Sequence, residues 1–137
     1  MNFYKLFFLI VLIVSFNNSA DGHGPSRQKV NEKIEINTNP DKVWKIVKNY
    51  MKFDWNSSVK KVTVENNDIG SERKLEFEGG KFVKQKLEKI DETKKFISWR
   101  IIETSNDVMP VNSYAAKIFV KDGEGGKTIV NYKAGFY

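Results

Sequence analysis

Apolar and polar side chains alternate along several short segments of this chain, which is the pattern of half-buried β-strands. In residues 29–37, Val30, Ile34 and Ile36 fall on one face and charged side chains on the other. Six later segments show the same alternation between turn signals: residues 61–65, 72–78, 82–90, 96–103, 111–121 and 128–136. The pattern therefore predicts seven strands.

Between the first two predicted strands the spacing of apolar residues becomes helical. The helix begins with an N-cap residue, a first-turn proline and an acid near the positive helix end: Asn39, Pro40 and Asp41. Residues 53–58 predict a second short helix or a bend. The order is strand, two helices and six strands, so we expect an α+β fold with an antiparallel sheet.

Each predicted strand is apolar on one face, and that face needs a covering layer. Two short helices cannot cover seven strands, and the sequence stops at Tyr137, at the end of a strand. We therefore expect a C-terminal helix that this chain lacks, which would make the chain a fragment. A smaller sheet, or a partner that covers the face, is the alternative.

The N-terminal segment predicts export. Residues 1–20 show one positive charge, an apolar run over residues 6–16 and then small polar residues, which is the layout of a signal peptide. The run is too short to span a bilayer. Cleavage after Ala20 or after Gly22 would suit this layout, and an uncleaved amphipathic anchor is the alternative. Residues 21–27 then form a flexible joint, and residues 28–137 form one domain.

Composition narrows the function classes. The chain has no cysteine, so it has no disulfide, no thiol nucleophile and no thiolate ligand. Its formal net charge is +6. A basic surface often binds nucleic acid, but export favours an acidic protein partner or an anionic surface, and a merely soluble lysine-rich surface is the simplest explanation.

Several motifs together carry a family resemblance. They are residues 39–44 (Asn-Pro-Asp-Lys-Val-Trp), Phe53 with Trp55, Gly70 with Arg73, Leu87 with Asp91, residues 99–101 (Trp-Arg-Ile), and Thr128 with Tyr132 and Phe136. In this order they resemble the START-like SRPBCC superfamily of polyketide cyclases and lipid-transport proteins. Residues 23–30, 32–37, 110–114 and 135–137 resemble the MxaD-type proteins within it.

The resemblance implies a helix-grip fold, in which a curved sheet grips a C-terminal helix around an apolar cavity. It also implies a periplasmic accessory role in methanol oxidation, assisting the encounter of a methanol dehydrogenase with its cytochrome. The chain departs from the pattern in two places. The terminal helix is absent, and Gln85 stands where many members carry an acid.

The sequence offers few combinations of residues that are typical of an active site. His23 is the only histidine and lies in the joint, so Ser-His and Cys-His arrangements are excluded from the domain. No carboxylate pair stands out, and no glycine-rich stretch opens a helix. We expect no cofactor, and an enzyme of the cyclase type ranks third among the functions.

Polar residues on the apolar strand faces are the better indication of a site. Arg73, Glu32, Gln85 and Tyr114 each share a face with apolar neighbours. Burying them unpaired would cost several kcal/mol, so they should pair with one another, hold water or meet a ligand. We take as candidate cavity residues Trp55, Arg73, Gln85, Trp99, Tyr114 and Tyr132. A carrier of a small hydrophobic ligand or lipid is accordingly the second function considered, after the accessory role.

Two further features concern partners and metals. Lysines gather around the predicted helices and form either a docking surface for an acidic partner or a solvated face: Lys42, Lys45, Lys48, Lys52, Lys60 and Lys61. Cleavage after Ala20 would expose Asp21, Gly22 and His23, whose nitrogens suit Cu(II) or Ni(II). No metal site is otherwise expected.

Overall fold

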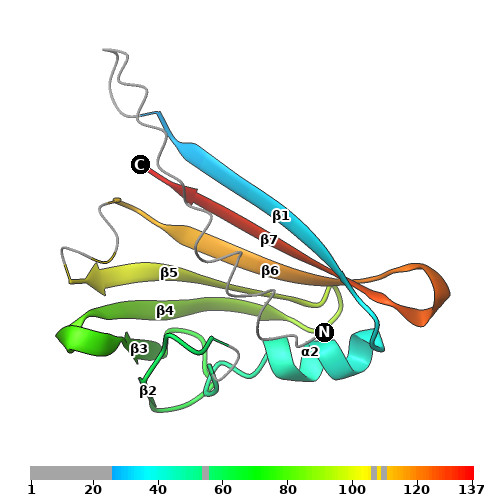
Figure 1. Cartoon of the computed structure of the whole chain (residues 1–137), viewed down its shortest axis with the longest axis horizontal. Coiled ribbons are helices and arrows are strands. Elements are labelled where there is room, and N and C mark those ends of the chain that lie inside the picture. The colour runs from blue at the N-terminus through cyan, green and yellow to red at the C-terminus, as the bar shows by residue number, and fades with distance from the viewer. Residues whose placement is uncertain (1–25, 54–55, 106–107, 109–110) are drawn as a thin grey trace.

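Seven antiparallel strands form one continuous, twisted sheet, as the alternation predicts (Figure 1). The computed structural model describes residues 26–53, 56–105, 108 and 111–137. Within them the sheet order is β1-β7-β6-β5-β4-β3-β2, so the first strand lies beside the last. The elements are β1 (Gln28–Ile36), α2 (Pro40–Val47), β2 (Lys61–Val64), β3 (Glu72–Glu76), η1 (Glu78–Gly80), β4 (Phe82–Asp91), β5 (Phe96–Thr104), β6 (Ala115–Asp122), η2 (Glu124–Gly126) and β7 (Thr128–Phe136).

The helix α2 lies at one end of the sheet, where it packs against β6 and β7 (Figure 1). The oxygen of the Asn39 side chain accepts a hydrogen bond from the Asp41 backbone N–H at 2.8 Å, which confirms the predicted cap. Val43 and Trp44 are buried. The Trp44 indole N–H donates to Glu92 Oε2 at 2.7 Å, and this bond ties the helix to the turn between β4 and β5.

The described residues contain one α-helix, and the second predicted helix is a bend where it can be described. The Asn56 side chain accepts from the Ser58 N–H at 3.0 Å, and the Asn56 carbonyl accepts from the Val59 N–H at 3.1 Å. This local side-chain turn competes with helix formation. Among the residues that the structure describes, no helix is long and apolar enough to span a membrane.

The sixth strand begins later than predicted, at Ala115 rather than at residue 111. Ser113 has a φ of 54°, a left-handed conformation that interrupts the ladder. Asn112 nevertheless exchanges two backbone hydrogen bonds with Tyr137, at 2.8 and 2.9 Å. The break therefore shifts the chain at the start of β6 without detaching it from the end of β7.

The two faces of the sheet differ in character. We call the face that carries Leu75, Leu87, Ile97, Ile118 and Val130 the inner face; all five of these side chains are buried. The opposite, outer face carries most of the charged side chains of the strands. Because side chains alternate along a strand, the apolar pattern of the sequence decides which residues lie on each face.

Candidate functional site

Arg73 places a guanidinium on the inner face, where it is 3 % exposed. Its Nε and Nη2 both donate to Gln85 Oε1, the former at 3.0 Å, and Nη1 donates to the Tyr50 carbonyl at 3.0 Å. The Tyr50 hydroxyl in turn donates to the Gln85 carbonyl at 3.0 Å. Arg73 and Gln85 thus pair with each other, one of the three arrangements considered for the polar residues on apolar strand faces, and Tyr50 completes a closed network.

Aromatic rings surround this guanidinium. Its central carbon lies 4.1 Å from the Tyr50 ring centroid, 4.6 Å from that of Phe53 and 5.7 Å from that of Trp99. No described carboxylate forms a salt bridge with Arg73, so ring faces and carbonyl oxygens compensate its charge. Burial lowers the pKa of Arg73 to about 10, and burial raises the pKa of Tyr50 to about 12. At neutral pH the network holds a cation and a neutral phenol.

The strand registers continue this polar group into a band across the inner face. Arg73 pairs with Gln85, and Gln85 pairs with Ile101. The Ile101 N–H then donates to the Tyr114 carbonyl at 2.8 Å, and the Tyr114 ring stacks on Phe136 with centroids 5.6 Å apart. Arg73, Gln85 and Tyr114, which were predicted from three separate strand patterns, are thus connected through Ile101.

Tyr114 and Tyr132 form a hydroxyl pair at the other end of the band. Their hydroxyl oxygens are hydrogen-bonded to each other, and both side chains are 7 % exposed. In the ladder Ala116 pairs with Ala134. Ala116 lies two residues after Tyr114 along the chain, and Ala134 lies two residues after Tyr132. These small side chains leave room above them in which two rings from different strands can meet.

The hydroxyl pair contains two O–H donors, and only one of them is used in the hydrogen bond between the two oxygens. One O–H donates to the other oxygen, and no described residue accepts the second O–H. Burial raises the pKa of Tyr114, and burial raises the pKa of Tyr132 well above that of an ordinary tyrosine. Both phenols therefore stay protonated at neutral pH, where they act as hydrogen-bond donors and not as bases.

A hollow of about 290 Å³ opens beside Tyr114. It lies between the end of β5 and the chain entering β6, with apolar walls from Ile101, Ile102 and Val111. Tyr114 is thus common to the hollow and to the hydroxyl pair. Polar residues complete its lining: Glu103, Thr104, Asn112 and Ser113. The volume is near the lower limit for small-molecule sites, which is about 300 Å³.

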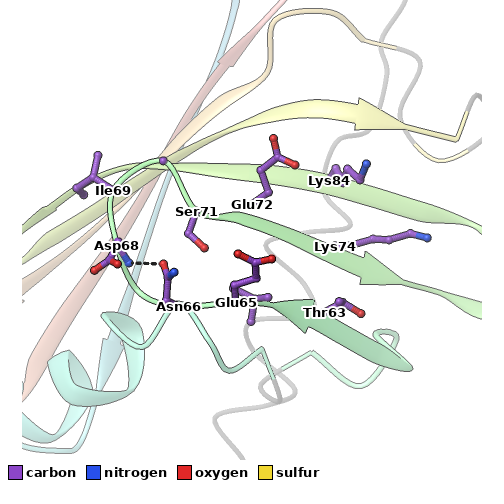
Figure 2. Close-up of a pocket in the computed structure, with 11 residues that line it drawn as sticks. Thr63, Glu65, Asn66, Asp68, Ile69, Ser71, Glu72, Lys74 and Lys84 are labelled. Carbon is purple, nitrogen blue, oxygen red and sulfur yellow. Dashed lines mark hydrogen bonds between the residues drawn. The ribbon is translucent and has the colours of Figure 1, made fainter.

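A second hollow, of about 570 Å³, lies at the β2 edge of the sheet, where β2 and β3 meet (Figure 2). Figure 2 shows its charged side chains pointing in different directions, with Asp68, Glu72 and Lys74 well apart. Lys74 and Lys84 form salt bridges with Glu76 and Glu103. The charged groups do not converge on a point, so this hollow is a weaker candidate.

Of the six predicted cavity residues, the structure joins five by direct contact, in two groups that the register aligns. Trp55 lies outside the described residues, as do the proposed metal-binding residues Asp21, Gly22 and His23. In the described part of the chain no cluster of histidine, aspartate or glutamate could hold a metal ion. Sequence reasoning missed Tyr50 and Phe53, because their role depends on the loop after α2.

Comparisons with known proteins agree with this fold. Residues 27–137 match the family described as polyketide cyclase / dehydrase and lipid transport. No curated protein sequence matches the chain. Similar solved structures include protein XoxI from Bacillus cereus, with TM-score 0.69 and 20 % identity over 79 % of this chain and 74 % of that one. A protein from Nitrosospira multiformis gives TM-score 0.69 and 19 % identity over 80 % of this chain and 79 % of that one.

A plant enzyme shares the fold as well. Norcoclaurine synthase from Thalictrum flavum, solved with dopamine and hydroxybenzaldehyde, gives TM-score 0.68 and 15 % identity over 89 % of this chain and 79 % of that one. At these identities the likeness concerns the fold alone, and it confirms the helix-grip class. With residues 27–137 matched, this chain belongs to the polyketide cyclase/dehydrase and lipid-transport family.

Proposed function

We propose that the inner face binds a small, mostly apolar molecule that carries one oxygen acceptor, seated in the hollow beside Tyr114. The observation that carries this proposal is the buried Tyr114–Tyr132 pair, whose second O–H finds no acceptor among the described residues. A buried donor without a partner costs free energy, and a ligand oxygen would recover it. Membership of a family of cyclases and lipid-transport proteins supports a ligand of this class.

The rest of the band supports the site from outside the hollow, since Ile101 and Tyr114 line the hollow and Arg73 and Gln85 do not. Arg73 and Gln85 are largely satisfied by each other and by Tyr50. They hold β3, β4 and the loop after α2 together, and Ile101 connects this rigid group to Tyr114. A site supported in this way binds by shape and by one placed hydrogen bond.

Equilibrium dialysis with two matched probes tests the proposal. Acetylnaphthalene carries a carbonyl acceptor, whereas ethylnaphthalene has nearly the same shape without it. We expect both to bind and the first to bind better. In Tyr114→Phe the preference should fall about fivefold, since one net hydrogen bond contributes about 1 kcal/mol.

Tyr137→Phe is the matched control, because Tyr137 is 45 % exposed and takes no part in the hydroxyl pair. Its preference should stay at the wild-type value. The ratio of the two affinities does not depend on the fraction of protein that is folded. Absence of binding by either probe, or an unchanged ratio in Tyr114→Phe, would refute the proposal.

A second candidate function is the periplasmic accessory role in methanol oxidation, with docking on the dehydrogenase or its cytochrome. The observation that favours it is the helix lysine cluster, the six lysines at positions 42, 45, 48, 52, 60 and 61. Lys48 bridges to Glu92 at 3.1 Å, and the other five are exposed and form no salt bridge with a described residue. Association through such a surface would weaken with salt.

The test of this role is dye-linked methanol oxidation by a purified dehydrogenase and cytochrome with the chain added. The role predicts a salt-sensitive stimulation that Lys45→Glu abolishes. Lys29→Glu should retain it, since Lys29 is exposed near the start of β1, at the opposite end of that strand from α2. Stimulation that is absent, or equal for both variants, would refute it.

A further inference from the structure

Five exposed lysines gather on the outer face of β1, β7 and β6. We call them the outer lysine face: Lys29, Lys33, Lys117, Lys121 and Lys133. None of them forms a salt bridge with a described residue. This surface is separate from the inner face and from the helix lysine cluster.

The ladder brings two of these charges directly together. Lys117 of β6 is paired with Lys133 of β7. Like charges directly opposite each other destabilise a sheet. The pair Lys74 and Lys84 on β3 and β4 has the same register, but there Glu76 and Glu103 supply carboxylates at 3.6 and 3.0 Å. In the described part of the chain, by contrast, neither Lys117 nor Lys133 forms a salt bridge.

Two phenylalanine rings hold several of these ammonium groups in place. Lys117 Nζ lies 5.3 Å from the Phe96 centroid, and Lys121 and Lys133 Nζ each lie 5.5 Å from that of Phe119. Phe96 is 7 % exposed and Phe119 is partly buried. The rings are therefore covered by lysine side chains and offer no platform on which nucleic-acid bases could stack.

The chemistry of this surface also separates lipid from protein partners. Specific protein interfaces are enriched in aromatic residues and arginine and depleted in lysine. The outer lysine face has the opposite composition, with hydrated point charges and no fixed bidentate geometry. Such charges suit a dense and laterally mobile array of anions, which anionic lipid headgroups provide.

We propose that the outer lysine face binds the headgroup surface of an anionic lipid bilayer. The attraction is electrostatic and falls off within a Debye length. Each lysine near such a surface contributes about a fivefold change in the partition coefficient. A chain docked in this way turns its inner face away from the bilayer, so the inner face stays accessible.

The test is co-sedimentation of the full chain with lipid vesicles. One set contains phosphatidylcholine alone, and the other contains roughly one-third phosphatidylglycerol. The apolar segment at residues 6–16 would partition into both sets, so the readout is the ratio of the two partition coefficients. We expect a ratio well above unity at low salt that falls as salt is added.

The double variant Lys117→Gln/Lys133→Gln should lower this ratio by about 25-fold, fivefold for each lysine. The control Lys74→Gln/Lys84→Gln removes an opposed pair of the same register on the same face, and should lower the ratio much less. Equal losses in both doubles, or a wild-type ratio near unity, would overturn the proposal. Equally tight binding of soluble polyglutamate through Lys117 and Lys133 would also overturn it, in favour of an acidic protein.

Discussion

Replacing Gln85 by methionine should destabilise the chain more than its modest change of volume suggests. The substitution removes the oxygen that accepts two N–H groups of the buried Arg73 guanidinium. Hydrogen bonds to a charged group contribute about 1.5–3 kcal/mol each. No described carboxylate is available to take over, so Gln85→Met should lower the free energy of unfolding by about 3–5 kcal/mol, in keeping with the loss of two such bonds.

Arg73→Met leaves two neutral oxygens without donors, the Gln85 amide oxygen and the Tyr50 carbonyl, rather than a buried charge. We expect a loss of about 1–3 kcal/mol for each orphaned oxygen. The double variant Arg73→Met/Gln85→Met removes both polar groups and fills the space with apolar atoms. It should be more stable than Gln85→Met alone, since apolar replacement of a buried polar pair is often nearly neutral.

Urea denaturation of the wild type and the three variants, followed by tryptophan fluorescence, measures the cycle. If Gln85→Met is unfolded in buffer, the recovery of a cooperative transition in the double variant is itself the readout. A double variant whose loss equals the sum of the single losses would refute the reasoning. A loss below about 1 kcal/mol for Gln85→Met would do the same, because it would mean that another group satisfies the guanidinium.

Three further predictions concern charge and pH. The hydrogen bond from Trp44 lowers the pKa of Glu92, so Glu92 contributes stability that is lost as the pH falls through that lowered pKa. In urea titrations at acid pH, the free energy of unfolding of Glu92→Gln should therefore decrease less with falling pH than that of the wild type. An unchanged pH dependence would contradict this. Burial raises the pKa of Tyr50 to about 12, so above a pH of about 10 the tyrosine ionises first in the unfolded state and wild-type stability falls. The difference in melting temperature between the wild type and Tyr50→Phe should therefore narrow above this pH. A difference that stays constant would exclude the effect. Lys133→Gln relieves the repulsion with Lys117 but also removes the Lys133 contact with the Phe119 ring, so its stability relative to the wild type should be greatest at low salt and fall by about 0.5 kcal/mol as salt screens the repulsion; a relative stability that does not change with salt would argue against it.

Much of the fold follows from local patterns that tertiary contacts did not override. The alternation of Val30, Ile34 and Ile36 predicts β1, and the Asn39 cap predicts where α2 begins. The predicted start of β6, at residue 111, was wrong because the sequence gives no clear signal for the left-handed conformation of Ser113. The pairing of β1 with β7, which completes the order of the sheet, was not predicted, because no spacing in the sequence indicates which strands lie side by side.

The sequence predicts which residues belong to the candidate site, but not which side chain each of them contacts. Arg73, Gln85 and Tyr114 stand out because a polar side chain on an apolar face needs a partner. Which partner it finds depends on the register, which a sequence pattern does not specify across strands. Tyr50 could not be assigned from the sequence, since it reaches the site only through the loop after α2.

The most direct test of the central claim is where a ligand binds on the sheet. Ala115 and Ala116 are neighbours on β6 that face opposite sides, and Ala134 is paired with Ala116 on the inner face. NMR titration of alanine-methyl-labelled full chain with acetylnaphthalene should shift Ala116 and Ala134 saturably and leave Ala115 unchanged. Saturable shifts at Ala115 alone, or no saturable shift at any of the three, would contradict a binding site on the inner face.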